Sequence, residues 1–345
     1  MRVELVDPRR DPSWLALVES RPSSVFHSPA WLGVLQDTYG FELFAPVLLD
    51  DNDMPMAGLP VCRVEDFLGA RLISLPFSDY CDPLVSTDHQ WERLVEPLIG
   101  ESCPVTTRCV HNQIPLADDR FGLMKEARWH SLDITKSLEA LWQGLDGAAR
   151  RAIRKAQGQG MEIREAKSAV EMRAFFDMHL AVRKHKYRLL AQPRAFFEQI
   201  WLHFVMPGQG FLLVATVNDR IVAGCLFLQW QQTLYYKFNA SVPDLLPERP
   251  NDLLIWEGIR RGQARGCTAL DFGLSDYDQE GLLRFKRKYA DSEKTISFLQ
   301  TRAPTAPAAA PGRDLLGELV RIFTDDSVPD SITEAAGDLL YRYFA

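Results

Sequence analysis

The sequence lacks the segments that would direct it to a membrane. Its N-terminus, MRVELVDPRRDPSW, has no apolar core of the kind that a secretory signal needs. Nowhere does it contain a run of about 18 apolar residues, which is what a membrane-spanning helix requires. We therefore expect a cytoplasmic protein with no transmembrane segment.

Metal-binding and disulfide patterns are also missing. The six cysteines form no CxxC pair, and none has a histidine at zinc-ligand spacing. We expect reduced, mostly buried thiols and no metal site.

Several catalytic signatures are absent as well. The seven histidines form no HExxH motif or recognisable triad, and no GxSxG elbow occurs, so the sequence does not favour a covalent serine or cysteine mechanism. Asp271-Phe272-Gly273 spells the magnesium motif of kinases, but no glycine-rich loop or HRD segment accompanies it. We expect no tightly bound cofactor. The formal net charge of −7 argues against a DNA partner.

What the chain does contain is enough apolar sequence for two cores. Hydrophobic residues make up 46% of its 345 residues, a length typical of two domains. In the second half, 211–217, 220–230 and 233–240 predict an antiparallel meander, followed by a helix capped by Asn251 or Asp252, a strand at 268–272, a helix at 280–289 and a strand at 294–299.

The first half predicts a similar order. A helix at 29–38 precedes strands at 41–49, 54–64 and 70–77, then a helix near 88–99 and a strand near 105–110. The segments 53–61 and 219–227 both place a turn Asp before a strand that carries Ala-Gly at the same offset. Duplication explains this match, and chance similarity of two hairpins is the alternative. We expect an α/β protein with domains at 1–134 and 135–302.

The last part, 303–345, differs in composition. An Ala/Pro-rich linker at 303–312 precedes two amphipathic helices, near 313–323 and 330–344. These helices either pack back on the core or contact a partner or a membrane surface.

Two cationic runs are candidate anion sites. A predicted helix places Arg150 and Arg154 on one face, where two guanidinium groups suit a phosphate, although a solvated face gives the same pattern. A second run contains Lys184 and His185. It is either a further anion site or the polar end of a helix.

Polar loops that follow strands are the other candidates. The segment 270–277 ends a strand, contains Asp271, Asp276 and Tyr277, and precedes a basic segment with Phe285 and Lys286. Ligands often bind at such a strand end, and Lys286 would stabilise a developing oxyanion unless it is simply exposed. In the first half, Asp79 and Tyr80 lie in a loop that is either a substrate site or an ordinary turn. We add Lys237 and Asn239, on the strand 233–240, as substrate-binding candidates.

These segments together resemble the Fem-type aminoacyltransferase family and its acetyltransferase-like relatives over most of 20–300. The residues that carry the resemblance lie at 27–31, 75–80, 150–160, 193–197, 270–273 and 285–289. The resemblance implies two tandem GNAT-like domains with mixed, largely antiparallel sheets, to which the short helical tail is added. It also implies a site in the cleft between the domains, with the family's Phe-Lys pair matching Phe285 and Lys286.

The implied reaction is direct attack by an amine on an activated acyl group. Asp79, Asp276 or Tyr277 would take the amine's proton, and basic residues matching Arg150 and Arg154 would face a phosphate-rich substrate. The expected function is transfer of an acyl or aminoacyl group to an amine of a cell-envelope or exopolysaccharide precursor, a small or nucleotide-linked molecule. The alternatives are an acyl-CoA-dependent N-acetyltransferase acting on an amino sugar or amino acid, and a non-catalytic assembly module.

The donor remains open between acyl-CoA and aminoacyl-tRNA. The helix after the meander lacks the glycine-rich phosphate-binding turn of coenzyme A acetyltransferases, and the chain has no long coiled-coil insertion of the kind found in some tRNA-using members. The sequence leaves the oligomeric state open.

Overall fold

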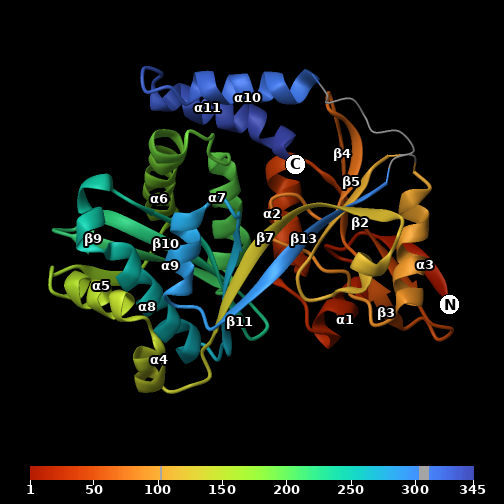
Figure 1. Cartoon of the computed structure of the whole chain (residues 1–345), viewed down its shortest axis with the longest axis horizontal. Helices are drawn as coiled ribbons and strands as arrows, with labels where there is room; N and C mark the ends of the chain where they lie inside the picture. Colours follow the sequence, from red (N-terminus) through yellow and green to blue (C-terminus); the bar gives the residue numbers. More distant parts are fainter. Residues whose placement is uncertain (102, 303–310) are drawn as a thin grey trace.

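The computed structural model describes residues 1–101, 103–302 and 311–345, and Figure 1 shows its two lobes joined by a long strand pair. The first part of the chain contains β1 (Arg2–Val6), α1 (Pro12–Ser20), α2 (Pro29–Tyr39), β2 (Glu42–Leu49), β3 (Pro55–Gly58), β4 (Val61–Asp66), β5 (Gly69–Ile73), α3 (Asp88–Ile99), β6 (Val105–Cys109) and β7 (Phe121–Asp133), with short 3-10 turns η1 (Val25–His27) and η2 (Ile114–Ala117).

The second part contains α4 (Leu138–Gly144), α5 (Gly147–Gln157), β8 (Glu162–Glu165), α6 (Ala169–Ala181), η3 (Val182–Lys186), α7 (Arg194–Ile200), η4 (Trp201–Val205), β9 (Gly210–Val217), β10 (Arg220–Trp230), β11 (Thr233–Ser241), η5 (Pro243–Glu248), α8 (Pro250–Ala264), β12 (Ala269–Ser275), α9 (Glu280–Arg287) and β13 (Ser292–Thr301). It repeats the order of the first part, with α4 and α5 added before it and α9 inserted before its last strand. The tail forms α10 (Pro311–Phe323), α11 (Asp330–Leu340) and η6 (Tyr341–Phe344).

The strands form one mixed sheet in the order β1-β2-β4-β5-β6-β13-β7-β12-β11-β10-β9-β8, with β3 paired to β2. Only β5–β6 and β11–β12 are parallel among the described pairs. Each parallel pair is joined by one helix, α3 in the first lobe and α8 in the second. The expected mixed, largely antiparallel α/β fold is therefore present in both halves.

The Ala-Gly match between the halves has the same packing role in each. Gly58 lies opposite Val47 on β2, and Gly224 lies opposite Val214 on β9. A Cβ on Gly58 would come within 2.8 Å of Leu17 from α1, and a Cβ on Gly224 within 2.5 Å of Phe175 from α6. Both glycines thus let a helix approach the sheet closely, which favours duplication over chance similarity.

Some predicted boundaries need correction. The strand expected at 54–64 is divided into β3 and β4 around Pro60, which has no N–H to continue the ladder. The cap of α8 is Arg249, in a left-handed conformation, and not Asn251 or Asp252, because Pro250 takes the first helical position. The strands β1 and β7 and the helix α1 were not predicted.

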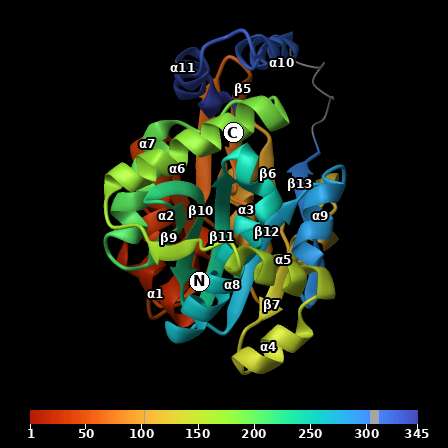
Figure 2. The same cartoon turned by 90° about the vertical axis from the view of Figure 1, so that its left-hand side faces the viewer.

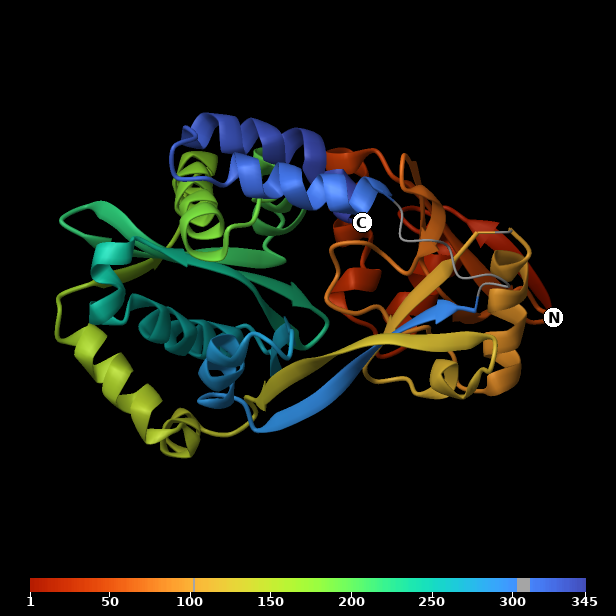
Figure 3. The same cartoon turned by 45° about the horizontal axis from the view of Figure 1, so that its top comes forward.

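The strand β13 ties the two lobes together. It pairs with β6 on one side and with β7 on the other, and β7 in turn pairs with β12. Figure 3 shows β7 and β13 as the ribbon that crosses from one lobe to the other. The loop that follows β5 meets β11 and β12 near this crossing.

The two tail helices pack back on the molecule beside α6, α7 and the β4–β5 hairpin. Most of the expected linker, 303–310, lies outside the described residues. No helix in the described ranges is long and apolar enough to cross a bilayer.

Candidate active site

The parallel strands β11 and β12 diverge where the candidate site begins. Their pairing covers only Thr233–Tyr235 against Ala269–Asp271, whereas on its other edge β12 pairs with β7 from Ala269 to Ser275. Lys237 on β11 and Gly273 on β12 lie just beyond this fork.

Asp79 comes from the first lobe and enters this fork. Its Oδ1 accepts a hydrogen bond from Lys237 Nζ at 3.0 Å, and the Lys237 side chain is only 5% exposed. The ammonium group also lies over the rings of Phe26 and Trp31, at 4.8 and 5.0 Å. The other face of Asp79 touches Gly273, where a Cβ would lie 2.2 Å from Oδ2. Only a glycine at this position leaves room for the carboxylate, and its φ of 64° also favours glycine.

Lys286 on α9 points into the same region. Its Nζ donates to the backbone carbonyls of Gly273 and Leu274, at 3.2 and 2.7 Å, and the side chain is buried. Burial lowers its pKa from 10.5 to about 8, while the nearby Asp79 and Asp271 carboxylates counteract the shift. An ammonium group has three donors, so two carbonyl partners leave one N–H for a ligand.

Asp271 supports the floor of the site. Its Oδ2 accepts from the Tyr80 hydroxyl at 2.6 Å, and its Oδ1 accepts from the Gly273 N–H at 2.6 Å. Burial raises the pKa of Asp271 to about 6 in spite of these hydrogen bonds. Burial also raises the pKa of Tyr80 well above its usual value, so Tyr80 stays a hydrogen-bond donor.

Sequence reasoning missed Arg108 on β6. Its Nη1 donates to the carbonyl of Ser78 at 2.6 Å, and its guanidinium group lies 5.2 Å above the Phe298 ring. Burial lowers the pKa of Arg108, and Asp79 and Asp276 oppose that shift. Lys237, Lys286 and Arg108 thus lie near Asp79, and Lys286 also lies near Asp271. Asp276, the third carboxylate nearby, is paired with Lys125, so the cluster keeps a surplus of positive charge.

The residues 27–31 hold the loop that carries Asp79. The His27 ring bonds to the Asp82 carbonyl at 2.8 Å, and Trp31 Nε1 donates to Ser78 Oγ at 2.8 Å. Burial lowers the pKa of His27 to about 4, so its ring is neutral. These residues position the loop without facing a ligand themselves.

Other predicted site residues lie around the rim. Asp276 pairs with Lys125 at 2.6 Å, and Tyr277 lies 4.9 Å from the Arg128 guanidinium group. Phe285 packs beside Tyr289 on α9, with ring centroids 5.6 Å apart. Asn239 lies on β11 two residues beyond Lys237.

The structure does not bring the cationic runs to this centre. On α5, half-buried Arg150 donates to Gln143 of α4 and exposed Arg154 lies over the Trp142 ring of α4. The helix α5 packs along the flank of α8 (Figure 2). Lys184 is buried against the tail, where Nζ donates to Asp330 at 2.7 Å, and His185 bonds to Asp326 at 2.9 Å. The second run therefore binds the tail in this structure.

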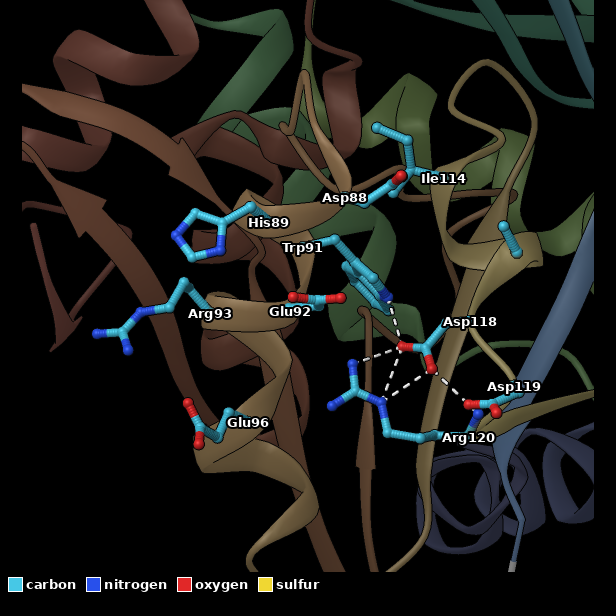
Figure 4. Close-up of a pocket in the computed structure, with 11 residues that line it drawn as sticks. Asp88, His89, Trp91, Glu92, Arg93, Glu96, Ile114, Asp118, Asp119 and Arg120 are labelled. Carbon is cyan, nitrogen blue, oxygen red and sulfur yellow. Dashed lines mark hydrogen bonds and ion pairs between the residues drawn. The ribbon is translucent and has the colours of Figure 1, made fainter.

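A separate hollow of about 550 Å³ lies between α3 and η2 in the first lobe (Figure 4). Its wall includes Trp91, whose Nε1 donates to Asp118, and Arg120, which pairs with the same carboxylate. None of the residues of the fork lines it.

Residues 147–287 match the family model described as an acetyltransferase (GNAT) domain. This segment includes the fork, Lys237, Gly273 and Lys286. The match confirms the prediction of an acyltransferase.

Solved structures extend the likeness to the whole fold. FemX superposes with a TM-score of 0.67 at 13% identity, covering 86% of this chain and 97% of that one. The chain has the Fem-type fold.

L-PGS from Bacillus licheniformis gives a TM-score of 0.58 at 14% identity, covering 93% of this chain and 99% of that one. A tandem GNAT protein from the clavulanic acid biosynthesis pathway gives 0.54 at 11% identity, covering 88% and 100%. The expected tandem GNAT-like fold is thereby confirmed. No curated protein matches the sequence significantly.

Proposed function

We propose that this Fem-type protein transfers an acyl or aminoacyl group to an amine of a cell-envelope or exopolysaccharide precursor, at the fork between its lobes. The observation that carries the proposal is the meeting of Asp79 from the first lobe with Lys237, Gly273 and Lys286 from the second. We also propose that the lobes correspond to domains 1–134 and 135–302, followed by the tail 303–345.

The residues present supply what aminolysis needs. The acceptor nitrogen attacks the carbonyl carbon of an ester or thioester, so a C–N bond forms and the carbonyl oxygen gains negative charge. The free N–H of Lys286 and the surplus positive charge of the cluster stabilise that oxyanion. Asp79 takes the proton of the amine and passes it to the alcohol or thiol that leaves as the C–O or C–S bond breaks.

Asp79 is our choice of proton acceptor over Asp271 and Asp276. Asp271 is buried and holds two hydrogen bonds, and Asp276 pairs with Lys125 at the rim. Asp79 retains 25% exposure and touches the residue whose carbonyl holds Lys286. The hydrogen bond from Lys237 would hold the Asp79 carboxylate in place, and Tyr80 would hold Asp271 beside it.

The donor is an acyl-CoA or an aminoacyl-tRNA. The match of 147–287 to an acetyltransferase family model favours acyl-CoA as the donor. It thereby supports the second candidate function, that of an N-acetyltransferase acting on an amino sugar or amino acid. The first turn of α8 disfavours a phosphate there, because Asp252 is buried in it and bonded to the Tyr289 hydroxyl at 2.6 Å. Arg150, which is half-buried, and the exposed Arg154 on α5 are our candidates for contact with the phosphates of either donor.

A mass-spectrometric transfer screen tests the proposal. Wild type and Lys286→Ala are incubated with acyl-CoAs or charged tRNA, each with amine-bearing nucleotide-sugar precursors. We expect one donor and acceptor pair to give an N-acylated product, and Lys286→Ala to lose about 100-fold or more in turnover while staying folded. Product formed equally by both proteins would contradict the assigned role of Lys286. Binding of a precursor with no transfer from any donor would favour an assembly module.

A further inference from the structure

The C-terminal tail contacts both lobes. On the second lobe, Arg194 at the start of α7 forms two hydrogen bonds with Glu334 of α11, at 2.7 and 3.1 Å. On the first lobe, Arg71 of β5 donates to the carbonyl of Ala345 at 3.2 Å. Figures 1 and 3 show the two tail helices over α6 and α7, with the chain end turned toward the first lobe.

The second lobe binds this tail through specific contacts. Lys184 is 1% exposed, and its ammonium group donates to Asp330 and to the carbonyl of Val328. Removing the tail would leave this buried charge without these partners. The backbones also touch closely, because a Cβ on Gly337 would lie 2.6 Å from the Ala191 carbonyl oxygen. A loosely attached tail would need neither feature.

Tyr341 extends this contact to the loop of the candidate site. Its ring lies 5.1 Å from that of Phe77, which packs on Tyr39 at 4.8 Å. Phe77 has a φ of 58° and Leu75 a φ of 63°, conformations that non-glycine residues rarely adopt. Surrounding contacts must hold such a loop in place. Asp79 follows two residues later.

We propose that Tyr341 is a positioning residue, which holds the loop 75–79 so that Asp79 meets Lys237 across the lobes. The tail thereby acts as a strap: Lys184 and Arg194 bind it to the second lobe, and Tyr341 packs on the first. This inference rests on the proposed function, since it assigns a use to Asp79.

Hydrogen exchange of the full-length protein tests the strap without any substrate. In Tyr341→Ala we expect amides 75–80 to exchange at least tenfold faster, because Phe77 loses the ring that covers it. Tyr341→Phe should restore the wild-type rate, since the ring is kept. Tyr343→Ala is the matched control, because Tyr343 packs on the exposed Phe67 of the β4–β5 hairpin and not on the loop.

The transfer assay adds a second readout. With the donor found by the screen, Tyr341→Ala should lose about tenfold in kcat with little change in the KM for that donor, and Tyr341→Phe should recover it. If Tyr341→Ala does not fold, Tyr341→Leu keeps the apolar volume and should show the same effect in smaller degree. Unchanged exchange at 75–80 in the folded variant would overturn the strap. Faster exchange in Tyr341→Ala together with no transfer by the wild type from any donor would overturn the proposed function and leave the contact itself intact.

Discussion

Lys237 Nζ donates a hydrogen bond to Asp79 Oδ1 over 3.0 Å, and this pair joins the two lobes at the candidate site. The lysine is almost fully buried beneath aromatic rings, whereas the aspartate retains some contact with solvent. The geometry fixes the carboxylate in place and leaves part of it accessible to an incoming amine.

A double-mutant cycle on this pair is the first prediction. Asp79→Asn should lower the free energy of unfolding by about 2 kcal/mol, because it leaves the Lys237 ammonium buried without its counter-charge. Lys237→Met alone should cost less, and the double variant should recover most of the loss in Asp79→Asn. Urea unfolding of the four proteins measures the coupling. Strictly additive effects would show that the pair does not interact in solution.

Gly273→Ala should damage the site directly. The added Cβ would overlap Asp79 Oδ2, and the φ of 64° strains any residue with a side chain. We expect a loss of about 2 kcal/mol in stability and a large fall in transfer rate. Gly281→Ala, in the first turn of α9 with no atom within 4 Å of its added Cβ, is the control and should be neutral or slightly stabilising. Similar effects of the two substitutions would refute the close approach of Asp79.

Lys286→Met should stabilise the protein at pH 7. A fall in the pKa of Lys286 from 10.5 to about 8 means that its buried ammonium group costs the folded state about 3 kcal/mol, a cost that the Met variant avoids. The variant also loses the hydrogen bonds to the two carbonyls, each of which lowers its stability by about 1 kcal/mol. The expected net gain is about 1 kcal/mol. Between pH 8 and 10.5 the unfolded chain binds more protons at Lys286 than the folded one, so wild-type stability rises with pH and the gain shrinks.

Urea unfolding of wild type and Lys286→Met at pH 7 and pH 10 measures this difference. Other titrating groups are common to the two proteins and largely cancel. A Met variant that is less stable than wild type at pH 7, or whose advantage grows with pH, would show that the buried ammonium group is not a cost to the fold.

Arg150 and Arg154 of α5 provide a separate test. Arg150→Ala with Arg154→Ala should weaken binding of a phosphate-bearing donor about tenfold, with a smaller effect at high salt. Arg260→Ala, an exposed arginine on α8 paired with Glu257, is the control. Isothermal titration with the donor found by the screen provides the measurement. Equal affinity of the double variant and the control would remove α5 from the binding surface.

The sequence predicted the elements whose pattern is local. The turn at 218–219 separates two apolar β-branched runs, and Asn218 and Asp219 both adopt the left-handed conformation that this turn requires. The helix 29–38 begins after Ser28, whose side chain caps it, and ends at Gly40 in the left-handed conformation. Such signals lie within a few residues of the element that they define.

The strand β7 could not be predicted in this way. Four consecutive exposed residues interrupt its burial pattern, so no alternation marks it as a strand. Its structure depends on pairing with β13, more than 150 residues later in the chain. Arg108 was missed for a related reason, because its burial depends on Ser78 and Phe298, which only the folded sheet brings to it.

The second cationic run shows what a local sequence pattern cannot predict. The sequence offered either an anion site or a polar helix end for Lys184 and His185. Neither alternative includes the acidic residues of the tail, which lie more than 140 positions away and supply the anions in the fold. A basic run indicates that negative charge is near, but it does not identify the source.

The pH dependence of transfer provides a direct test of charge at the centre. If the ammonium form of Lys286 stabilises the oxyanion, kcat/KM should fall above pH 8, where the buried amine loses its proton. Lys286→Arg places a guanidinium group that stays charged, so its remaining activity should not fall in that range. The rising limb, set by the acceptor amine, is common to the two proteins, so their activity ratio isolates residue 286. If the activity of Lys286→Arg falls over the same pH range as that of the wild type, the titration belongs to another group, and Lys286 is excluded as the source of the charge.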